Sequence, residues 1–345
     1  TVHTDYFEEY VENIEQVIPL ERVDYLIMNH NEPDHSGSVS KLLERCPDLK
    51  IFCTAAGKKH LEEITNRTFP VQVVKAGDTL DLGGKTLEFI PAPMLHWADS
   101  MFTWDPADKV VFTCDFLGAH FCEPTMLDSK IHDKAAYAGE RHFYYQCIFG
   151  PFASYVQAGL SKLPAEAEMA CTSHGPVLTE TLEECKALYR QWSTPVPKEG
   201  KTAAIIYASA YGCTRALAQA AAEALEEMGI RTVQHDVTME SLDACAAIAN
   251  EADVVLVGSA TINRDAPKAV WDVLGSIDAI NTKGRAAGAF GAYGWSGEAP
   301  GMLQTRLGQL KFATPAEAFR VLFTPTQSDL DAMKDYARSV AALLK

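Results

Sequence analysis

The sequence predicts a two-domain α/β protein, in which a domain of mixed α/β layers precedes a doubly wound parallel sheet. Strand-like and helix-like segments alternate along the 345 residues, which is the pattern of α/β folds. A stretch with two prolines, a glycine and several polar residues interrupts this alternation. We therefore expect a first domain over 1–194, a linker over 195–201 and a second domain over 202–345.

Composition and charge narrow the class of protein. Hydrophobic residues make up 47% of the chain and charged residues 22%, as in globular proteins. The formal net charge of −16 argues against nucleic acid or a membrane as a partner, because both attract clustered Lys and Arg. No apolar run approaches the roughly 18 residues of a membrane span, and no signal peptide is evident. The nine cysteines are scattered without a C-x-x-C pair, so we expect a reduced, cytoplasmic protein.

In the first domain, short strand and helix patterns alternate irregularly. The stretch 6–18 is amphipathic and needs a cover for its apolar face. Because the chain also begins at Thr1 rather than Met, we expect further residues upstream. The expected strands are 23–29, 49–54, 71–75, 86–91, 101–104, 110–114 and 169–172, and the expected helices are 38–45, 58–66, 133–145, 153–163 and 182–192.

The second domain has a regular pattern of five strand–helix units. Such spacing predicts a parallel sheet with helices on both faces and ligands at the carboxyl ends of its strands. The expected strands are 203–208, 231–236, 254–258, 286–291 and 319–323, and the expected helices are 214–228, 241–249, 266–276, 300–310 and 327–344.

Histidines and carboxylates follow several predicted strands of the first domain. The densest run is His30-Asn31-Glu32-Pro33-Asp34-His35, directly after the first strand. A lone histidine at a strand end is usually structural, but four of them at such ends indicate a metal site. Imidazole and carboxylate ligands without thiolate suit iron, zinc or manganese. The expected ligands are His30, Glu32, Asp34, His35, His96, Asp115 and His174. We expect the other histidines to be structural: His3, His60, His120, His132, His142 and His235.

Three loops of the second domain have residues suited to binding a ligand with an anionic group and a flat ring. The loop 209–214 opens a helix with small and hydroxyl residues, so its amides can converge on an anion. It is neither a Walker A loop nor a dinucleotide fingerprint. The loops 258–264 and 291–299 follow later strands, and the second sets aromatics among glycines, which can stack on a flat ring. The expected binding residues are Ser209, Ala210, Tyr211, Gly212, Cys213, Thr214, Ala260, Thr261, Ile262, Asn263, Tyr293, Gly294, Trp295, Ser296 and Gly297.

These motifs resemble those of a known family. The pattern H-x-x-x-D-H with distant His, Asp and His is similar to the metallo-β-lactamase fold, and Glu32 inside it resembles the flavodiiron proteins. The S-x-aromatic-G-x-T loop at Ser209 and the Tyr-Gly-Trp-Ser-Gly-Glu run at Tyr293 are also similar to that family. The resemblance covers essentially the whole chain. It implies a metallo-β-lactamase-like αββα sandwich followed by a flavodoxin-like five-stranded parallel sheet.

The resemblance also implies the cofactors, which are FMN and two non-haem irons. One iron would be held by His30, Glu32 and His96, and the other by Asp34, His35 and His174, with Asp115 bridging them. Family members carry several strands before the point that corresponds to Thr1, and residues from those strands line part of the pocket.

By the same resemblance, the protein is an oxidoreductase that reduces O2 to water, NO to N2O, or both. FMN would re-reduce the irons, and Tyr144 or Tyr145 would offer a hydroxyl to the reduced substrate. Since no C-x-x-C module follows Lys345, the electron donor would be a separate protein such as rubredoxin. A head-to-tail homodimer, or a tetramer built from such dimers, would place each flavin beside the partner's irons. The sequence does not separate O2 from NO as the preferred gas.

Three alternatives stay open at this point. A zinc hydrolase of the metallo-β-lactamase type fused to a flavodoxin-like module would share the scaffold, although Glu32 adds a hard anionic ligand that favours iron redox chemistry. The second alternative is not an enzyme but a flavodoxin-like electron carrier with a vestigial first domain. A partial chain that lacks its first strands would have neither activity.

Overall fold

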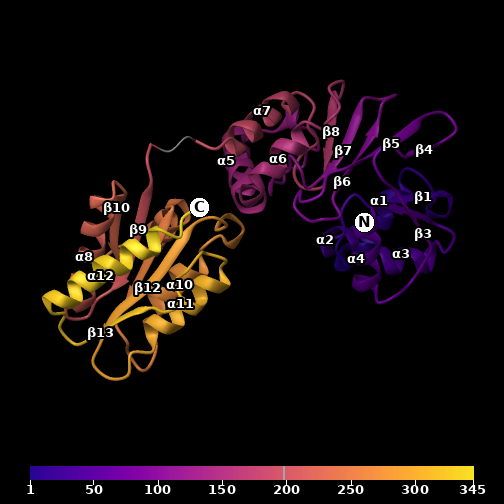
Figure 1. Cartoon of the computed structure of the whole chain (residues 1–345). Coiled ribbons are helices and arrows are strands. Elements are labelled where there is room, and N and C mark those ends of the chain that lie inside the picture. Colours follow the sequence, from indigo (N-terminus) through magenta and orange to yellow (C-terminus); the bar gives the residue numbers. More distant parts are fainter. Residues whose placement is uncertain (197–198) are drawn as a thin grey trace. The chain divides into compact units, whose positions relative to one another are not determined.

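A computed structural model describes residues 1–196 and 199–345 of the chain. The chain folds into two compact units, Thr1–Pro195 and Val196–Lys345 (Figure 1). Positions 197 and 198 of the expected linker lie outside the described residues. Among the helices of the described chain, none has the length and apolar character to cross a membrane.

The first unit contains two sheets. One is parallel, in the order β1-β2-β3, and the other has the order β4-β5-β6-β7-β8 with only the β7–β8 pair parallel. The strands are β1 Tyr25–Ile27, β2 Lys50–Cys53, β3 Val71–Val73, β4 Thr79–Asp81, β5 Thr86–Pro91, β6 Met101–Asp105, β7 Val110–Cys114 and β8 Met169–Thr172. The helices are α1 Phe7–Glu15, α2 Pro33–Ser36, α3 Val39–Arg45, α4 Ala55–Thr65, α5 Lys134–Tyr144, α6 Ala153–Leu160 and α7 Leu182–Ser193.

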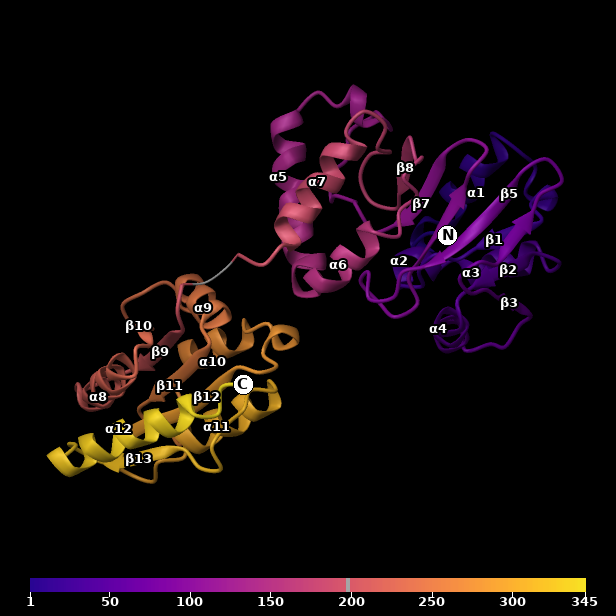
Figure 2. The ribbon, with the colours of Figure 1, turned by 45° about the horizontal axis from the view of Figure 1, so that its top comes forward.

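The two sheets pack face to face, with helices outside them. Phe52 of β2 stacks on Phe89 of β5 with ring centroids 5.9 Å apart, and Met101 of β6 lies in the same buried cluster. The helices α5, α6 and α7 lie on the side of β7 and β8, whereas α3 and α4 lie beside β1–β3 (Figures 1 and 2). The unit therefore has four layers, helix–sheet–sheet–helix.

The amphipathic α1 finds its cover within the described chain. Phe7 and Val11 are buried, and they pack in one cluster with Leu42 of α3 and with Leu49. Arg45 of α3 also lies over the Phe7 ring, 4.9 Å from its centroid. The apolar face that the sequence predicted is thus the face that packs on α3.

The second unit is one parallel sheet in the order β10-β9-β11-β12-β13. Alternate residues of β9 point to opposite faces, so that Ile205 packs with α8 and α12 while Ile206 packs with α9, α10 and α11. The strands are β9 Thr202–Ala208, β10 Arg231–Asp236, β11 Val254–Ser259, β12 Ala286–Tyr293 and β13 Phe319–Leu322. The helices are α8 Cys213–Glu227, α9 Leu242–Glu251, α10 Lys268–Gly275, α11 Ala299–Gln309 and α12 Gln327–Ala341.

The strand order reverses between β9 and β11. From β9 the chain first moves to one side, to β10, and then returns to the other side through β11 and β12. In sheets of this kind the crevice at the carboxyl ends of the two strands is the usual ligand site. The loops after β9 and β11 are two of the three that the sequence predicted to bind a cofactor.

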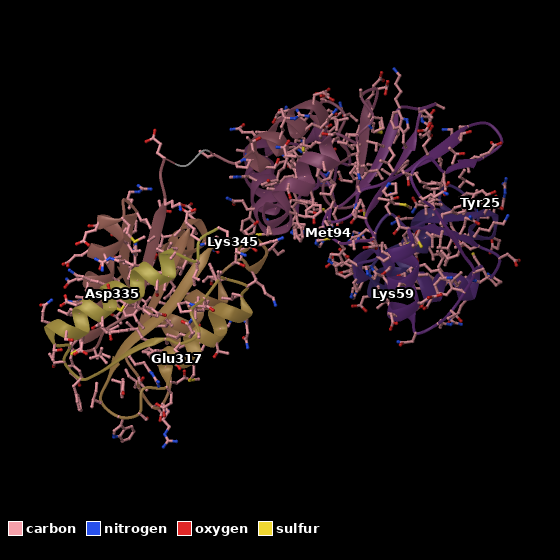
Figure 3. The ribbon with its side chains drawn as sticks, viewed as in Figure 1. Tyr25, Lys59, Met94, Glu317, Asp335 and Lys345 are labelled. Atoms are coloured by element: carbon pink, nitrogen blue, oxygen red, sulfur yellow. The ribbon has the colours of Figure 1, made fainter. Side chains whose placement is uncertain are left out.

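Charged side chains cover both units. Lys59, Glu317 and Asp335 are examples that extend from the ribbon in Figure 3, and all three are exposed. The acidic surplus of the chain, a formal net charge of −16, is therefore carried mainly on exposed side chains, apart from a few buried carboxylates.

Replacing Gly291 with Ala should destabilise the second unit. An added Cβ would lie 2.0 Å from the backbone oxygen of Ser259 and 2.8 Å from Cγ of Pro300, so β11 and β12 would have to move apart. Overpacking of this kind costs about 1–3 kcal/mol of the free energy of unfolding. Gly301→Ala in α11 is the matched control, because a Cβ there meets nothing within 4 Å and Ala gains about 0.5–1 kcal/mol in a helix. Urea denaturation followed by circular dichroism compares the variants, and an unchanged midpoint for Gly291→Ala contradicts this packing.

Candidate functional site

The loop after β1 presents its side chains to one point. Pro33 begins the short helix α2, and Glu32 precedes it in an extended conformation. The hydroxyl of Ser36 donates to the carbonyl oxygens of Asn31 and Glu32, at 2.8 Å and 3.0 Å, which fixes the turn. As a result His30 and His35 are both buried, with 1% and 8% of their surface exposed.

The Asp115 carboxylate lies between four imidazoles. Its Oδ2 is 3.5 Å from Nε2 of His30 and 3.2 Å from Nε2 of His96. Its Oδ1 is 2.8 Å from Nε2 of His35 and 3.4 Å from Nε2 of His174. Each carboxylate oxygen therefore faces its own pair of histidines.

The other two predicted carboxylate ligands, Glu32 and Asp34, each lie beside one of these histidine pairs. Glu32 Oε2 is 3.0 Å from Nε2 of His96, and Asp34 Oδ2 is 3.1 Å from Nε2 of His174. The potential ligand atoms of His30, Glu32, His96 and Asp115 all lie within 4.8 Å of one another, and so do those of Asp34, His35 and His174. The structure thus brings all seven predicted ligands together and separates them into His30, Glu32, His96 and Asp115 on one side and Asp34, His35, His174 and Asp115 on the other.

This donor set fits two hard or borderline cations. The Oδ1 of Asp34 is buried without a hydrogen-bond partner in the described chain, as expected for an atom that receives a metal ion. Cys114 also lies beside Asp115 and His35, but burial raises the pKa of its thiol, so it remains a neutral neighbour rather than a thiolate ligand.

The charges of the metal-free site depend on one another. Burial raises the pKa of Asp115, but the nearby rings of His174, His35 and His96 outweigh burial, so the net pKa is well below its ordinary value. Burial lowers the pKa of His174, yet the hydrogen bond to Asp115 and the neighbouring carboxylates outweigh it, and the net pKa is raised. For His30 burial again lowers the pKa, and Asp99 and Asp115 reverse the shift. Without metal, protons on the histidines balance the carboxylates.

Sequence reasoning missed two residues next to this site, Asp99 and His60. Asp99 is fully buried, and its Oδ1 lies 3.1 Å from Nδ1 of His30 and 3.4 Å from Nδ1 of His60. Histidine ligands of metals usually give their second ring nitrogen to a carboxylate, so an Asp three residues after His96 was a usable signal for Asp99. For His60, in the middle of α4, the sequence offers no comparable signal.

The two predicted catalytic tyrosines have different surroundings. The Tyr144 hydroxyl donates to the backbone oxygen of Asp115 at 3.1 Å, and its ring lies against the rings of His120 and His174, 4.7 Å and 6.1 Å between centroids. The Tyr145 ring instead contacts Tyr189 and Trp192, at 5.0 Å and 5.1 Å. Tyr144 ends α5 and Tyr145 begins a π-helical turn, Tyr145–Phe149, and neighbouring residues of a helix point in different directions.

The second unit has a cavity of about 380 Å³ at the ends of β9, β11 and β12. The hydroxyl of Ser209 accepts hydrogen bonds from the amides of Gly212 and Arg215, at 3.1 Å and 3.2 Å, and Gly212 has a φ of 86° that favours glycine. Of the predicted residues, those that line the cavity are Ser209, Ala210, Tyr211, Cys213, Thr214, Ala260, Thr261, Ile262, Tyr293 and Gly294. Gly212, Asn263, Trp295, Ser296 and Gly297 are not among the lining residues, whereas Ala292 and Phe323 are additions.

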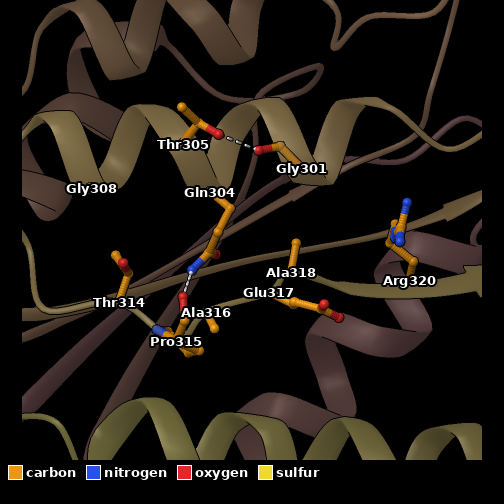
Figure 4. A pocket seen from close by; sticks show the side chains of 10 residues that line it. All are labelled: Gly301, Gln304, Thr305, Gly308, Thr314, Pro315, Ala316, Glu317, Ala318 and Arg320. Atoms are coloured by element: carbon orange, nitrogen blue, oxygen red, sulfur yellow. Dashed lines mark hydrogen bonds between the residues drawn. The ribbon is translucent and has the colours of Figure 1, made fainter.

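The cavity fits FMN in its chemistry. The loop 209–214 leads into the amino end of α8, where backbone amides favour a phosphate. The Tyr211 and Trp295 rings are strongly exposed, 96% and 83%, and can lie against a flat ring. A second hollow of about 520 Å³ lies between α11 and the segment before β13, and it contains none of the predicted residues (Figure 4). Gln304 in that hollow already donates to the Pro315 oxygen and accepts from the Ala289 amide.

Comparison with known proteins agrees with this geometry. A model described as ODP family beta lactamase matches residues 2–170, and a flavodoxin model matches residues 205–335. The flavo-diiron protein FprA2 of Clostridium acetobutylicum is 44% identical over 99% of this chain and 88% of the relative. This chain belongs to the flavodiiron proteins. The predicted fold class is confirmed, and family membership implies FMN, a non-haem diiron centre and oxidoreductase chemistry.

Further relatives in the flavodiiron family are similar over most of their length. The anaerobic nitric oxide reductase flavorubredoxin of Vibrio vulnificus is 30% identical over 99% of this chain and 70% of the relative. The solved rubredoxin oxygen:oxidoreductase of Desulfovibrio gigas is 30% identical with a TM-score of 0.67, and the match covers 99% of this chain and 86% of that one.

The metal-free protein should lose stability as the pH rises. The pKa values of His30 and His174 are raised above the ordinary 6.5, so their contribution is complete below pH 6.5 and is lost as the pH rises through the folded values. The pKa of Asp115 is lowered from 3.8, so its contribution is present above that pH. Thermal melts of chelator-treated protein at pH 6 and pH 8.5 measure the difference. His174→Asn should reduce the difference in melting temperature between the two pH values. His132→Asn is the control and should leave that difference unchanged, because the His132 side chain is 86% exposed. The same difference in wild type and both variants would contradict the site electrostatics.

Proposed function

We propose that this flavodiiron protein reduces O2 to water, NO to N2O, or both, in the first unit, with electrons that enter through FMN in the second. The observation that carries the proposal is Asp115, whose two oxygens each face one group of histidine and carboxylate ligands. A carboxylate in that position can bridge two metal ions. The names of two relatives support the two gases, since one is a rubredoxin oxygen:oxidoreductase and the other an anaerobic nitric oxide reductase.

The proposed ligands are the seven residues that the structure brings together. His30, Glu32 and His96 would hold one iron, Asp34, His35 and His174 the other, with Asp115 between them. When bound, two ferrous irons supply two electrons and reduced FMN two more, which together suffice for O2 or for a pair of NO molecules. The residues around them orient these ligands, keep Asp115 ionised and exclude bulk water, since His30, Phe149 and Phe116 are buried. We further propose a separate electron donor of the rubredoxin type, as the names of the relatives suggest.

Activity and cofactor content test the proposal together. Protein reconstituted with iron and FMN should consume O2 or NO when a reduced donor is supplied, each gas being offered alone in a sealed cell with an electrode. Asp115→Asn should abolish turnover and lower the bound iron, because it removes charge from the one residue shared by both ligand groups. Asp128→Asn is the matched control, a buried carboxylate outside the ligand set that accepts hydrogen bonds from Thr179, Glu180 and Thr181. Zinc in place of iron, with esterase activity and no gas consumption, would support the hydrolase alternative instead.

Tyr144 is the tyrosine that we propose to supply a proton to the reduced substrate. Burial raises its pKa well above the ordinary value, so the hydroxyl beside the Asp115 carbonyl would give up its proton only to a strongly basic group, such as a reduced oxygen or nitrogen atom. Tyr144→Phe should lower kcat by roughly 10²-fold or more, as for loss of a general acid, while iron content is retained. Tyr145→Phe removes a hydroxyl from a neighbouring ring whose aromatic contacts are Tyr189 and Trp192, and should leave kcat nearly unchanged. Equal kcat values for the two variants would remove Tyr144 from the mechanism.

We also propose the head-to-tail homodimer, or a tetramer built from it, as the active form. The metal ligands all lie in Thr1–Pro195 and the flavin cavity is lined only by residues of Val196–Lys345, so a partner's unit can complete the electron path. Sedimentation velocity at micromolar concentration should show a dimer or tetramer. Activity per chain should fall on dilution below the dissociation constant, whereas a fully active monomer would rule the dimer out.

A further inference from the structure

Asp99 occupies an interior position between β5 and β6. Its carboxylate is fully buried and makes directed contacts with both of its oxygens. Oδ1 lies 3.1 Å from Nδ1 of His30, while Oδ2 accepts from the backbone amide and the side-chain amide of Asn31, at 2.8 Å and 2.9 Å. The Thr54 hydroxyl, at the start of α4, donates to the backbone oxygen of Asp99 at 3.0 Å. Asp99 is therefore held by two segments of chain and in turn holds the loop that begins the metal site.

These contacts define which ring nitrogen of His30 carries the proton. An ionised carboxylate only accepts hydrogen bonds, so Nδ1 of His30 must be the donor toward Asp99. Nε2 lies 3.4 Å from Glu32 and 3.5 Å from Asp115, where a metal ion would displace any proton that it carries and bind its lone pair. This is the tautomer that a metal ligand needs, and the partner at the second ring nitrogen is what normally fixes it.

Of the four ligand histidines in the described chain, only His30 has a carboxylate at its Nδ1 atom. The carboxylate contacts of His35, His96 and His174 are all made by Nε2. Within the described residues, no carboxylate pairs with Nδ1 of any of these three. The group of His30, Glu32 and His96 therefore contains a ligand that is oriented before metal binds, and the group of Asp34, His35 and His174 has no equivalent.

We propose that Asp99 is a positioning residue that acts through His30 and makes the half with His30, Glu32 and His96 the tighter of two unequal metal sites. This inference rests on the proposed function only in its assignment of the metal ligands. It adds that the two metal ions bind in sequence rather than together, and that a residue outside the ligand set decides the order. Removal of such a partner typically lowers metal affinity 10- to 100-fold.

His60 supplies a matched comparison at the same carboxylate. Its Nδ1 is 3.4 Å from Oδ1 of Asp99, and its ring lies edge-on to Trp97, as does the ring of His30. The geometry at that nitrogen does not amount to a hydrogen bond. His60 is also part-exposed, and within the described chain it makes no ion pair or ring contact with Glu32, Asp115 or His96. A change at His60 therefore disturbs the same corner of the fold without removing the orientation of His30.

Metal titration of the full chain tests the proposal without any activity assay. Metal-free protein is titrated anaerobically with Co²⁺ in the presence of a competing chelator, and the two affinities are read from the visible spectrum. Asp99→Asn keeps the shape of the side chain, and its oxygen can still accept from Asn31. The side-chain NH2 group of the new Asn would then face Nδ1 of His30. Because this group donates rather than accepts, the tautomer of His30 with the proton on Nδ1 is no longer favoured. We expect one of the two affinities to fall 10- to 100-fold and the other to stay within about twofold.

Two controls separate positioning from general destabilisation. His60→Asn and Asp128→Asn should leave both affinities within about twofold of wild type. In a His30→Ala background, Asp99→Asn should add no more than about twofold, because the residue through which Asp99 acts is gone. If Asp99→Asn does not fold, Asn31→Ala frees Oδ2 of Asp99 and should cause a smaller loss at the same site.

The outcomes distinguish this inference from the proposed function. If wild-type protein binds two metal ions and Asp99→Asn binds them with unchanged affinities, the inference is wrong and the diiron assignment stands. An equal loss at both sites, or the same loss in the His30→Ala background, likewise overturns it. If wild-type protein binds no pair of metal ions, the proposed function and the inference fail together.

Discussion

A buried carboxylate between four imidazoles is the constraint on which the first unit depends. Asp115 is 2% exposed and ionised, and an isolated charge in such a place would be strongly unfavourable. Three other segments of chain must therefore deliver a cation or a proton-bearing ring to it. They do so from the loops after β1, β5 and β8, which the facing sheets bring to one edge together with the loop after β7 that carries Asp115. The aromatic cluster of Phe102, Phe116 and Phe149 packs beneath that edge and leaves little room for the loops to relax.

The second unit builds its site from shape rather than charge. Its cavity lies where parallel strands end and the strand order reverses, so the position follows from topology. The close approach of Gly291 to the Ser259 carbonyl and the positive φ of Gly212 leave the backbone close to where a ligand lies. No opposed charges of the kind around Asp115 are needed there, and the lining residues are mostly small, hydroxyl-bearing or aromatic. Both units thus form their sites from loops at the ends of strands, but the side chains in those loops differ in their chemistry.

The sequence could predict those parts of the two sites that local patterns mark, and not the contacts that only the fold creates. The His30–His35 run and the loop at Ser209 are local patterns whose place at a strand end brings their partners near, so they were recognisable without coordinates. The three-residue β4 between Gly77 and Gly83 was missed, because so short a strand has no period to detect. The rule that ligand histidines pair with a carboxylate made Asp99 a candidate, but only the fold shows that it pairs with His30, 69 residues away. That Tyr144 and Tyr145 point to different surroundings follows from helix geometry, but which of the two faces the ligands depends on the packing of α5, which residue type alone does not specify.

The charge of the ligand set bears on what the site can do. Glu32, Asp34 and Asp115 each add one negative charge, and their oxygens lie at or near the four imidazoles. An imidazole at position 32 would leave the same pair of divalent ions with one more uncompensated positive charge in a buried place. Each further charge gained on oxidation would then cost more, because attraction and repulsion are stronger away from water. The carboxylate at Glu32 lowers that cost, so the same fold that suits hydrolysis with neutral ligands here suits metal ions that change their oxidation state. Since Glu32 pairs with His96 and lies beside His30, this effect is exerted in the half of the site that Asp99 orients.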